Sequence, residues 1–164
     1  MEATLSRDYE QLAVGDSFST RARTITEADI VAFASLTGDM HPQHTDAAWA
    51  ANSLFGERIA HGMLVVSYAL GLMALDPERV VALRRVREAV FKRPVAIGDT
   101  IHAEGRIERL DTIDGGTGIV GVRVDVVNQR SKAVARAAID VIWRRGDLAP
   151  AAVEEAFEMA GLPL

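Results

Sequence analysis

The sequence contains no cysteine, so neither a disulfide framework nor thiolate chemistry is available to it. With a net charge of −5, the chain lacks the excess of basic residues that nucleic-acid-binding proteins show. The most hydrophobic run, residues 63–75, is shorter than the roughly 20 residues that a helix needs to cross a bilayer. The N-terminal stretch MEATLSRDYEQL is too charged and too interrupted for a signal peptide. We therefore expect a cytoplasmic protein with no nucleic-acid and no membrane partner.

Several widespread functional motifs are also missing. The chain has no Walker-type loop and no GxGxxG, the glycine-rich segments that cradle phosphates. It has no GxSxG, and Ser67 lies inside an apolar run without an obvious base, so a serine hydrolase is not expected. We predict no cofactor.

Length and composition favour one globular domain. With 164 residues, of which 49% are apolar and 25% charged, the chain is long enough for a substantial core. We see no linker, repeat or low-complexity segment, so we assign residues 1–164 to a single domain.

Helical signals occupy the first half of the chain. Thr26 is a suitable N-cap with Asp29 three residues later, as in a capping box, and residues 27–36 follow at helical spacing. A short helical turn is expected at residues 46–51. Residues 63–75, MLVVSYALGLMAL, are apolar nearly all round, which is typical of a helix buried on every side. A buried strand can look similar, but the length and the Leu, Met and Ala content favour a helix.

The second half of the chain has β character. Strands are predicted at residues 85–91, 100–110, 117–128 and 133–143, and their hairpin-like order implies antiparallel pairing. The alternation of side chains assigns these residues to the inner face of the sheet: Ile101, Ala103, Ile107, Val120, Val122, Val124, Val126, Ala137, Ile139, Val141 and Trp143. A short amphipathic helix is expected at residues 150–160. The sequence thus predicts an α+β domain with a buried central helix against a long antiparallel sheet.

One polar stretch, TGDMHPQHTD, places two aspartates and two of the four histidines around a single proline. It can be interpreted as a surface turn, as an acid–base site, or as a metal site with Asp39, His41, His44 and Asp46 as ligands. Pro42 argues against a regular helix that would bring the two histidines onto one face. The spacing matches no zinc signature, so we predict no metal.

A second stretch, RIAHGMLV, places Gly62 at the expected N-terminus of the buried helix. The first backbone N–H groups of a helix have no intrahelical partner, and the helix dipole favours negative charge there. Because glycine lets a ligand approach the backbone closely, this position could stabilise a developing oxyanion. Tight packing of the helix against the sheet would require a glycine equally well.

Together these segments resemble the MaoC-like dehydratases, the (R)-specific enoyl-CoA hydratases of the hot-dog fold. Their motif Gly-Asp-x-Asn-Pro-apolar-His is similar to Gly38-Asp39-Met40-His41-Pro42-Gln43-His44 in this chain. The later segments FGERIAHGML and RPVAIGDT resemble the family in place and order. The resemblance covers residues 10–144.

The resemblance implies a hot-dog domain, in which a curled antiparallel sheet wraps a long helix, with a core at residues 10–145 and a C-terminal tail at residues 146–164. Such domains usually dimerise edge to edge, so a homodimer or higher homo-oligomer is expected. An acyl thioester, carried by coenzyme A (CoA) or by acyl carrier protein, would bind near the helix N-terminus.

The same resemblance assigns roles to individual residues. Asp39 and His44 would activate water for addition to a 2,3-enoyl thioester, and Gly62 N–H would bind the thioester oxygen. The product would be an (R)-3-hydroxyacyl thioester, and the reverse dehydration would use the same groups. His61 and Ser67 would support this site. His41 and Gln43 depart from the motif, and a more polar pocket would favour a polar or branched acyl group.

Two other functions are compatible with the same fold. In a hot-dog thioesterase a lone carboxylate attacks or activates water at the thioester carbonyl, whereas this chain pairs its carboxylate with His44. A non-catalytic acyl-thioester-binding subunit would not need the intact pair. Five basic residues could meet the phosphates of the carrier or simply form a solvated face: Arg84, Arg85, Arg87, Lys92 and Arg93. His102 is expected to be solvated on the outer face of a strand.

Overall fold

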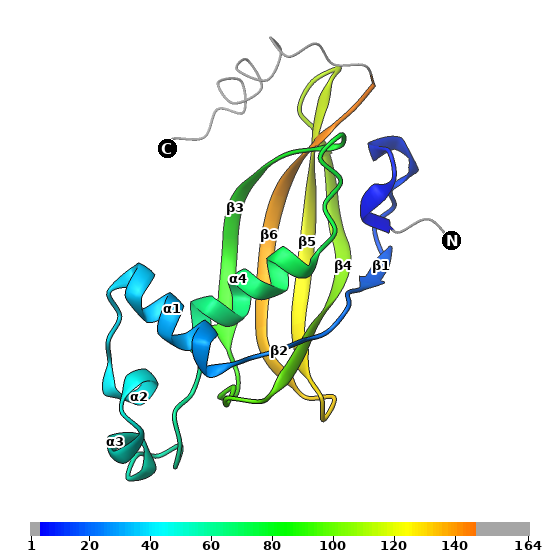
Figure 1. Ribbon diagram of the computed structural model, residues 1–164. Coiled ribbons are helices and arrows are strands. Elements are labelled where there is room, and N and C mark those ends of the chain that lie inside the picture. The colour runs from blue at the N-terminus through cyan, green and yellow to red at the C-terminus, as the bar shows by residue number, and fades with distance from the viewer. Residues whose placement is uncertain (1–3, 147–164) are drawn as a thin grey trace.

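The computed structural model describes residues 4–146, which form helices in the first half and long strands in the second (Figure 1). Two 3₁₀ helices, η1 (Thr4–Ser6) and η2 (Tyr9–Gln11), and two short strands, β1 (Ser17–Ser19) and β2 (Arg23–Thr24), come first. The α-helices are α1 (Glu27–Thr37), α2 (Pro42–Thr45), α3 (Ala47–Ala51) and α4 (Gly62–Leu72). The long strands are β3 (Val80–Phe91), β4 (Thr100–Thr112), β5 (Thr117–Asn128) and β6 (Ala133–Arg144).

The strands form one antiparallel sheet with the order β1-β4-β5-β6-β3, and β2 also pairs with β4. Successive strands β4, β5 and β6 are neighbours, as their hairpin-like order predicts, and β3 crosses over to pair with β6. Within the described residues β3 is therefore an edge strand. The helices α1, α2 and α3 lie beyond this edge (Figure 1).

Helix α4 lies across one face of the sheet and forms the core with it (Figure 1). All the strand residues predicted to face inward are at most 1% exposed. The period-two pattern predicts this because alternate side chains of a strand project to opposite faces. The α+β architecture and the four long strands are confirmed, although β3 begins five residues earlier, at Val80.

The expected capping box at the start of α1 is confirmed. The Thr26 side chain accepts the backbone N–H of Asp29, and the Asp29 carboxylate accepts the backbone N–H of Thr26. Asp29 also accepts hydrogen bonds from Tyr68 of α4 at 2.6 Å and from Arg23 at 2.8 Å. These contacts hold the pKa of the Asp29 carboxyl well below its usual range, although burial acts in the opposite direction. The network ties α1 to α4.

Two helix predictions were wrong in part. Helix α4 ends at Leu72 instead of residue 75, and it is not buried on every side. The sheet covers only one side of it, and Met63, Ser67 and Gly71, which are spaced four residues apart, are exposed. The proline in TGDMHPQHTD also does not prevent a helix, because α2 begins at Pro42 itself. Proline is tolerated at the first helical position, where its missing N–H would have no partner.

The sheet face that turns away from α4 carries a buried charge cluster. Asp140 of β6 is fully buried, and three guanidinium groups surround its carboxylate. Arg85 and Arg87 of β3 and Arg109 of β4 approach it at 3.1, 2.8 and 3.1 Å. Gly121 lies between Arg109 and Asp140 on β5, and a Cβ there would come within 3.0 Å of the Arg109 Cβ. The missing side chain gives Arg109 room to reach across the strand.

The amphipathic helix predicted at residues 150–160, with Val153, Phe157 and Ala160 on one side, lies outside the described residues. The assignment of residues 1–164 to a single domain stays a prediction. None of the helices within residues 4–146 is long and apolar enough to span a bilayer.

Candidate active site

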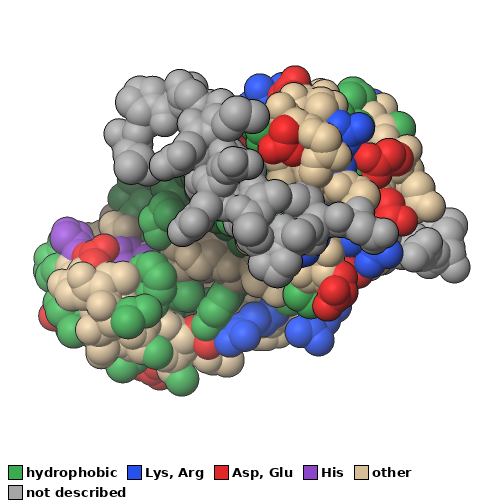
Figure 2. Space-filling model, turned by 90° about the horizontal axis from the view of Figure 1, so that it is seen from above, with side chains coloured by type: hydrophobic (Ala, Val, Ile, Leu, Met, Phe, Trp, Pro, Cys, Tyr) green, Lys and Arg blue, Asp and Glu red, His purple; other side chains and the backbone are tan. Residues whose placement is uncertain are grey.

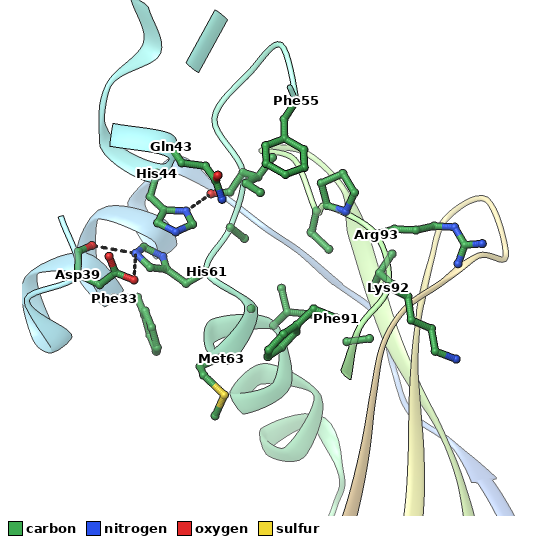
Figure 3. Close-up of a pocket in the computed structure, with 18 of the residues that line it drawn as sticks. Phe33, Asp39, Gln43, His44, Phe55, His61, Met63, Phe91, Lys92 and Arg93 are labelled. Atoms are coloured by element: carbon green, nitrogen blue, oxygen red, sulfur yellow. Dashed lines mark hydrogen bonds and ion pairs between the residues drawn. The ribbon is translucent and has the colours of Figure 1, made fainter. Parts of the chain in front are cut away.

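A cavity of about 610 Å³ lies where the N-terminus of α4 meets the end of β3 and the α1–α3 region. Asp39, His44 and His61 lie on one side of it, and Phe91, Lys92 and Arg93 lie on the other (Figure 3). Its lining is mainly apolar and includes Phe33, Phe55, Ile59, Met63, Val65, Phe91, Val95 and Val134. Seen from above, histidine side chains gather at one side of the molecule next to hydrophobic ones (Figure 2). The arrangement suits an apolar ligand with a reactive polar group.

Asp39 lies in the loop that follows α1. Gly38 ends that helix in the left-handed conformation, with φ of 78°, which glycine adopts without steric cost. The chain then turns toward the cavity, and the Asp39 side chain remains about half exposed. Its carboxylate is therefore available to a ligand or a water molecule in the cavity.

His44 lies on α2 and is buried, with 8% of its surface exposed. Its Nδ1 is 2.7 Å from the carbonyl oxygen of Ile59. A carbonyl only accepts hydrogen bonds, so Nδ1 carries the hydrogen and Nε2 keeps its lone pair. Burial lowers the pKa of His44 below the usual value for histidine, which favours the neutral ring. His44 thus presents a basic Nε2 near neutral pH.

His61 joins Asp39 to His44. Its ring stacks on the His44 ring, with centroids 3.7 Å apart, and its Nε2 lies 3.0 Å from the backbone oxygen of Asp39. Phe33 packs against its other side at 5.1 Å. The sequence suggested a supporting role for His61 only through the family resemblance. The contact between His61 Nε2 and the backbone oxygen of Asp39 spans 22 residues of sequence, so a local sequence pattern could not reveal it.

Gly62 is the first residue of α4, as predicted, and it lines the cavity. The preceding His61 makes no side-chain cap, so its ring leaves the N–H groups of the first turn free for a ligand. A Cβ at position 62 would lie only 2.6 to 2.8 Å from three ring atoms of Phe91. Glycine is therefore required for close packing between α4 and the end of β3, and the stabilisation of an oxyanion by its N–H stays a prediction.

The residues that could hold a metal differ from those considered in the sequence. Asp39, His44 and His61 offer ligand atoms that all lie within 4.8 Å of one another. However, the two imidazoles are stacked with only 25° between their planes, so their lone pairs do not converge on one point. Of the ligands considered in the sequence, His41 uses its Nδ1 to accept the backbone N–H of Gln43, and Asp46 uses its Oδ1 to accept the backbone N–H of Trp49. The geometry favours acid–base chemistry over metal binding.

The other predicted residues divide into two groups. Gln43 lines the cavity, as do Lys92 and Arg93. His41 and Ser67 are exposed and are not among the described residues that line it.

The remaining basic residues of β3 lie away from the cavity. Arg85 and Arg87 bind Asp140 on the far face of the sheet. His102 is partly exposed on β4 and lies 3.3 Å from Glu104. Sequence reasoning did not identify the aromatic walls Phe33, Phe55 and Phe91, because residues from three separate segments meet there only in the fold.

Comparison with known proteins gives matches of family and fold. The MaoC like domain matches residues 10–129. The chain is 39% identical to the (R)-specific enoyl-CoA hydratase of Rhodospirillum rubrum over 98 residues, which are 58% of this chain and 65% of that protein. It spans 28% of the length of Protein MaoC from Klebsiella aerogenes, to which it is 46% identical over 94 residues.

Solved structures agree with this result. The monoamine oxidase regulatory protein of Archaeoglobus fulgidus superimposes with a TM-score of 0.81 at 36% identity, over 86% of this chain and 96% of that chain. The Mycobacterium tuberculosis protein Rv0216, which has a double hot-dog fold, gives a TM-score of 0.76 at 23% identity over 89% of this chain and 47% of that one. Because the family match extends over most of the sequence and the fold agrees, this chain belongs to the MaoC-like domain family and has a hot-dog fold.

Proposed function

We propose that this chain catalyses the (R)-specific hydration of 2-enoyl thioesters, or the reverse dehydration of (R)-3-hydroxyacyl thioesters. The observation that carries the proposal is the proximity of the Asp39 carboxylate and the His44 ring, whose ligand atoms lie within 4.8 Å of each other, at the cavity that holds the N-terminus of α4. Relatives named as an (R)-specific enoyl-CoA hydratase and a 3-hydroxybutyryl-CoA dehydratase support this type of chemistry.

In the proposed reaction Asp39 and His44 hold one water molecule between them. Ligand atoms within 4.8 Å of each other allow a single water to hydrogen-bond to both groups. His44 Nε2 removes a proton as the water oxygen bonds to C3 of the substrate, and the electron pair of the double bond moves toward the thioester oxygen. Asp39 and His44 then deliver the proton that His44 has removed to C2 of the substrate. One water molecule thus supplies both the hydroxyl group at C3 and the hydrogen at C2.

Gly62 N–H would stabilise the negative charge that develops on the thioester oxygen. A backbone donor at a helix N-terminus is aligned with the helix dipole and needs no rearrangement during the reaction. The apolar walls of the cavity would hold the acyl chain, and Gln43 would provide the polar contact that favours a polar or branched acyl group.

The carrier would enter along the side of the cavity that bears Lys92 and Arg93 (Figure 3). Two cations at the rim are suited to the phosphate groups that CoA and the prosthetic group of acyl carrier protein share. Neutral variants at these positions would raise KM for the carrier-bound substrate and leave kcat nearly unchanged, because phosphate contacts lie far from the reacting carbons.

We expect two copies of the chain to associate through the edge strand β3. Within residues 4–146 the outer edge of β3 is unpaired, and Leu83, Val86 and Val90 of that strand are 38 to 47% exposed. Met63 on the uncovered side of α4 is 49% exposed. An unpaired edge strand with exposed apolar side chains favours pairing with an identical edge.

The proposal can be tested by hydration assays over a panel of enoyl-CoA thioesters, with product chirality as a second readout. Asp39→Asn and His44→Ala should each reduce turnover by about 10²–10⁴-fold without unfolding the protein. Because the two groups act on one water, the double variant should be little worse than either single one. Release of free CoA without hydration would instead identify a thioesterase, and near-wild-type turnover of His44→Ala would contradict the assignment.

A further inference from the structure

His41 makes a specific hydrogen bond although it lies outside the cavity lining. Its Nδ1 accepts the backbone N–H of Gln43 at 3.1 Å and so caps the N-terminus of α2. Asn, Asp, Ser and Thr side chains usually perform this role. The cap requires a lone pair on Nδ1, so the ring hydrogen of neutral His41 must lie on Nε2.

The capped turn carries His44. Helix α2 has only four residues, so few backbone hydrogen bonds hold it, and its first N–H groups depend on a cap or on water. The backbone N–H of His44 donates to the carbonyl of His41 at 2.9 Å. The His41 ring also meets the His44 ring at 6.3 Å and the Trp49 ring of α3 at 5.5 Å, both edge-on. The protonation state of His41 should therefore affect the position of His44 on α2.

We propose that His41 is a proton-sensitive positioning residue, which caps α2 and holds His44 when its Nδ1 is free and releases the cap when Nδ1 is protonated. The inference rests on the proposed function and adds a control by pH to the same site. A protonated Nδ1 is a donor and cannot accept the N–H of Gln43. Histidine is the side chain whose charge ordinarily changes between pH 5 and 8. An asparagine, which stands at this place in the hydratase motif, would cap the turn at any of these pH values.

The titratable side chains of the segments packed around His41 are two carboxylates and two imidazoles. The carboxylates are Asp39, whose Oδ1 accepts the backbone N–H of His41 at 3.3 Å, and Asp46, the N-cap of α3. The imidazoles are His44, which meets the His41 ring edge-on, and His61, which stacks on His44. Because burial lowers the pKa of His44, that ring stays neutral over part of the range in which histidines titrate.

The pH dependence of kcat in three proteins tests this role: wild type, His41→Asn and His41→Ala. Asparagine retains an acceptor at every pH, so His41→Asn should match wild type above neutrality. As the pH falls, wild type should lose activity relative to His41→Asn by about fivefold, the effect of one typical cap. His41→Ala lacks the acceptor and should run parallel to His41→Asn but about fivefold lower throughout. Superimposable wild-type and His41→Asn profiles would overturn the inference.

A second readout does not depend on turnover. In NMR spectra the amide proton of Gln43 should shift with pH in wild type as its acceptor is lost, and it should not shift in His41→Asn. If no enoyl thioester is hydrated but this difference is present, the proposed reaction fails while the proton-sensitive cap stands. A Gln43 amide that responds to pH equally in both proteins would show that His41 is not the switch.

Discussion

Replacing Gly62 by proline tests whether a backbone N–H at the start of α4 binds the thioester oxygen. Proline deletes this donor, and the site accommodates it in two respects. Position 62 is the first helical residue, where proline is tolerated. His61 before it is already extended, with φ of −58° and ψ of 137°, as a residue preceding proline must be. The helix should therefore remain folded without the donor.

Phe91 complicates the choice of control. Alanine keeps the N–H, but its Cβ would lie 2.6 to 2.8 Å from the Phe91 ring. Ordinary carbon contacts are about 3.5–4.0 Å, so the ring would have to move by about 1 Å. Proline carries the same Cβ and would cause the same displacement. The comparison should therefore be made in a Phe91→Ala background, where position 62 has room for either residue.

In that background Gly62→Ala should retain kcat to within a few-fold, since the donor is intact. Gly62→Pro should lower kcat by about 10²–10³-fold, the usual cost of one oxyanion donor, or about 2.7–4 kcal/mol of transition-state stabilisation. Hydration kinetics on an enoyl-CoA, with circular dichroism and melting curves for folding, provide the measurements. A folded proline variant that turns over within tenfold of the alanine variant would refute the placing of the oxygen at this helix end.

Three further outcomes are expected. Asp140→Asn should lower the free energy of unfolding by about 3–5 kcal/mol in urea titrations, because three guanidinium groups lose a buried counter-ion. The control Glu108→Gln removes a partly exposed ion pair with Arg123 and should lower it by at most about 1 kcal/mol. Equal losses in the two variants would refute this reasoning. Activity should survive exhaustive chelation, since the stacked imidazoles do not converge on an ion; loss that a divalent metal restores would contradict this. Val90→Lys, on the open edge of β3, should shift the proposed homo-oligomer toward monomer in sedimentation experiments, and unchanged association would exclude this edge as the interface.

Much of the fold was predictable because it follows from local alternation and capping. Valines at every second position of β5 need one buried face, and the strand forms over the predicted range. Thr26 and Asp29 satisfy each other's backbone groups, so the start of α1 is specified within four residues of sequence. The sequence correctly predicted that α4 is a helix and where it begins, but not where it ends or which of its side chains are exposed. Exposure depends on how much of a helix the sheet covers, which no local pattern contains.

The candidate site was predictable only where residues close in sequence carry it. Asp39 and His44 belong to one motif, and Gly62 is marked by its place before an apolar run, so the sequence itself indicated a carboxylate, a base and a helix N-terminus. Only the tertiary structure brought the His61 ring between Phe33 and His44 and the Phe91 ring onto Gly62. It also decided that Ile59 selects the tautomer of His44. Those contacts join segments 15 to 29 residues apart, and their geometry comes from packing, which local propensity does not encode.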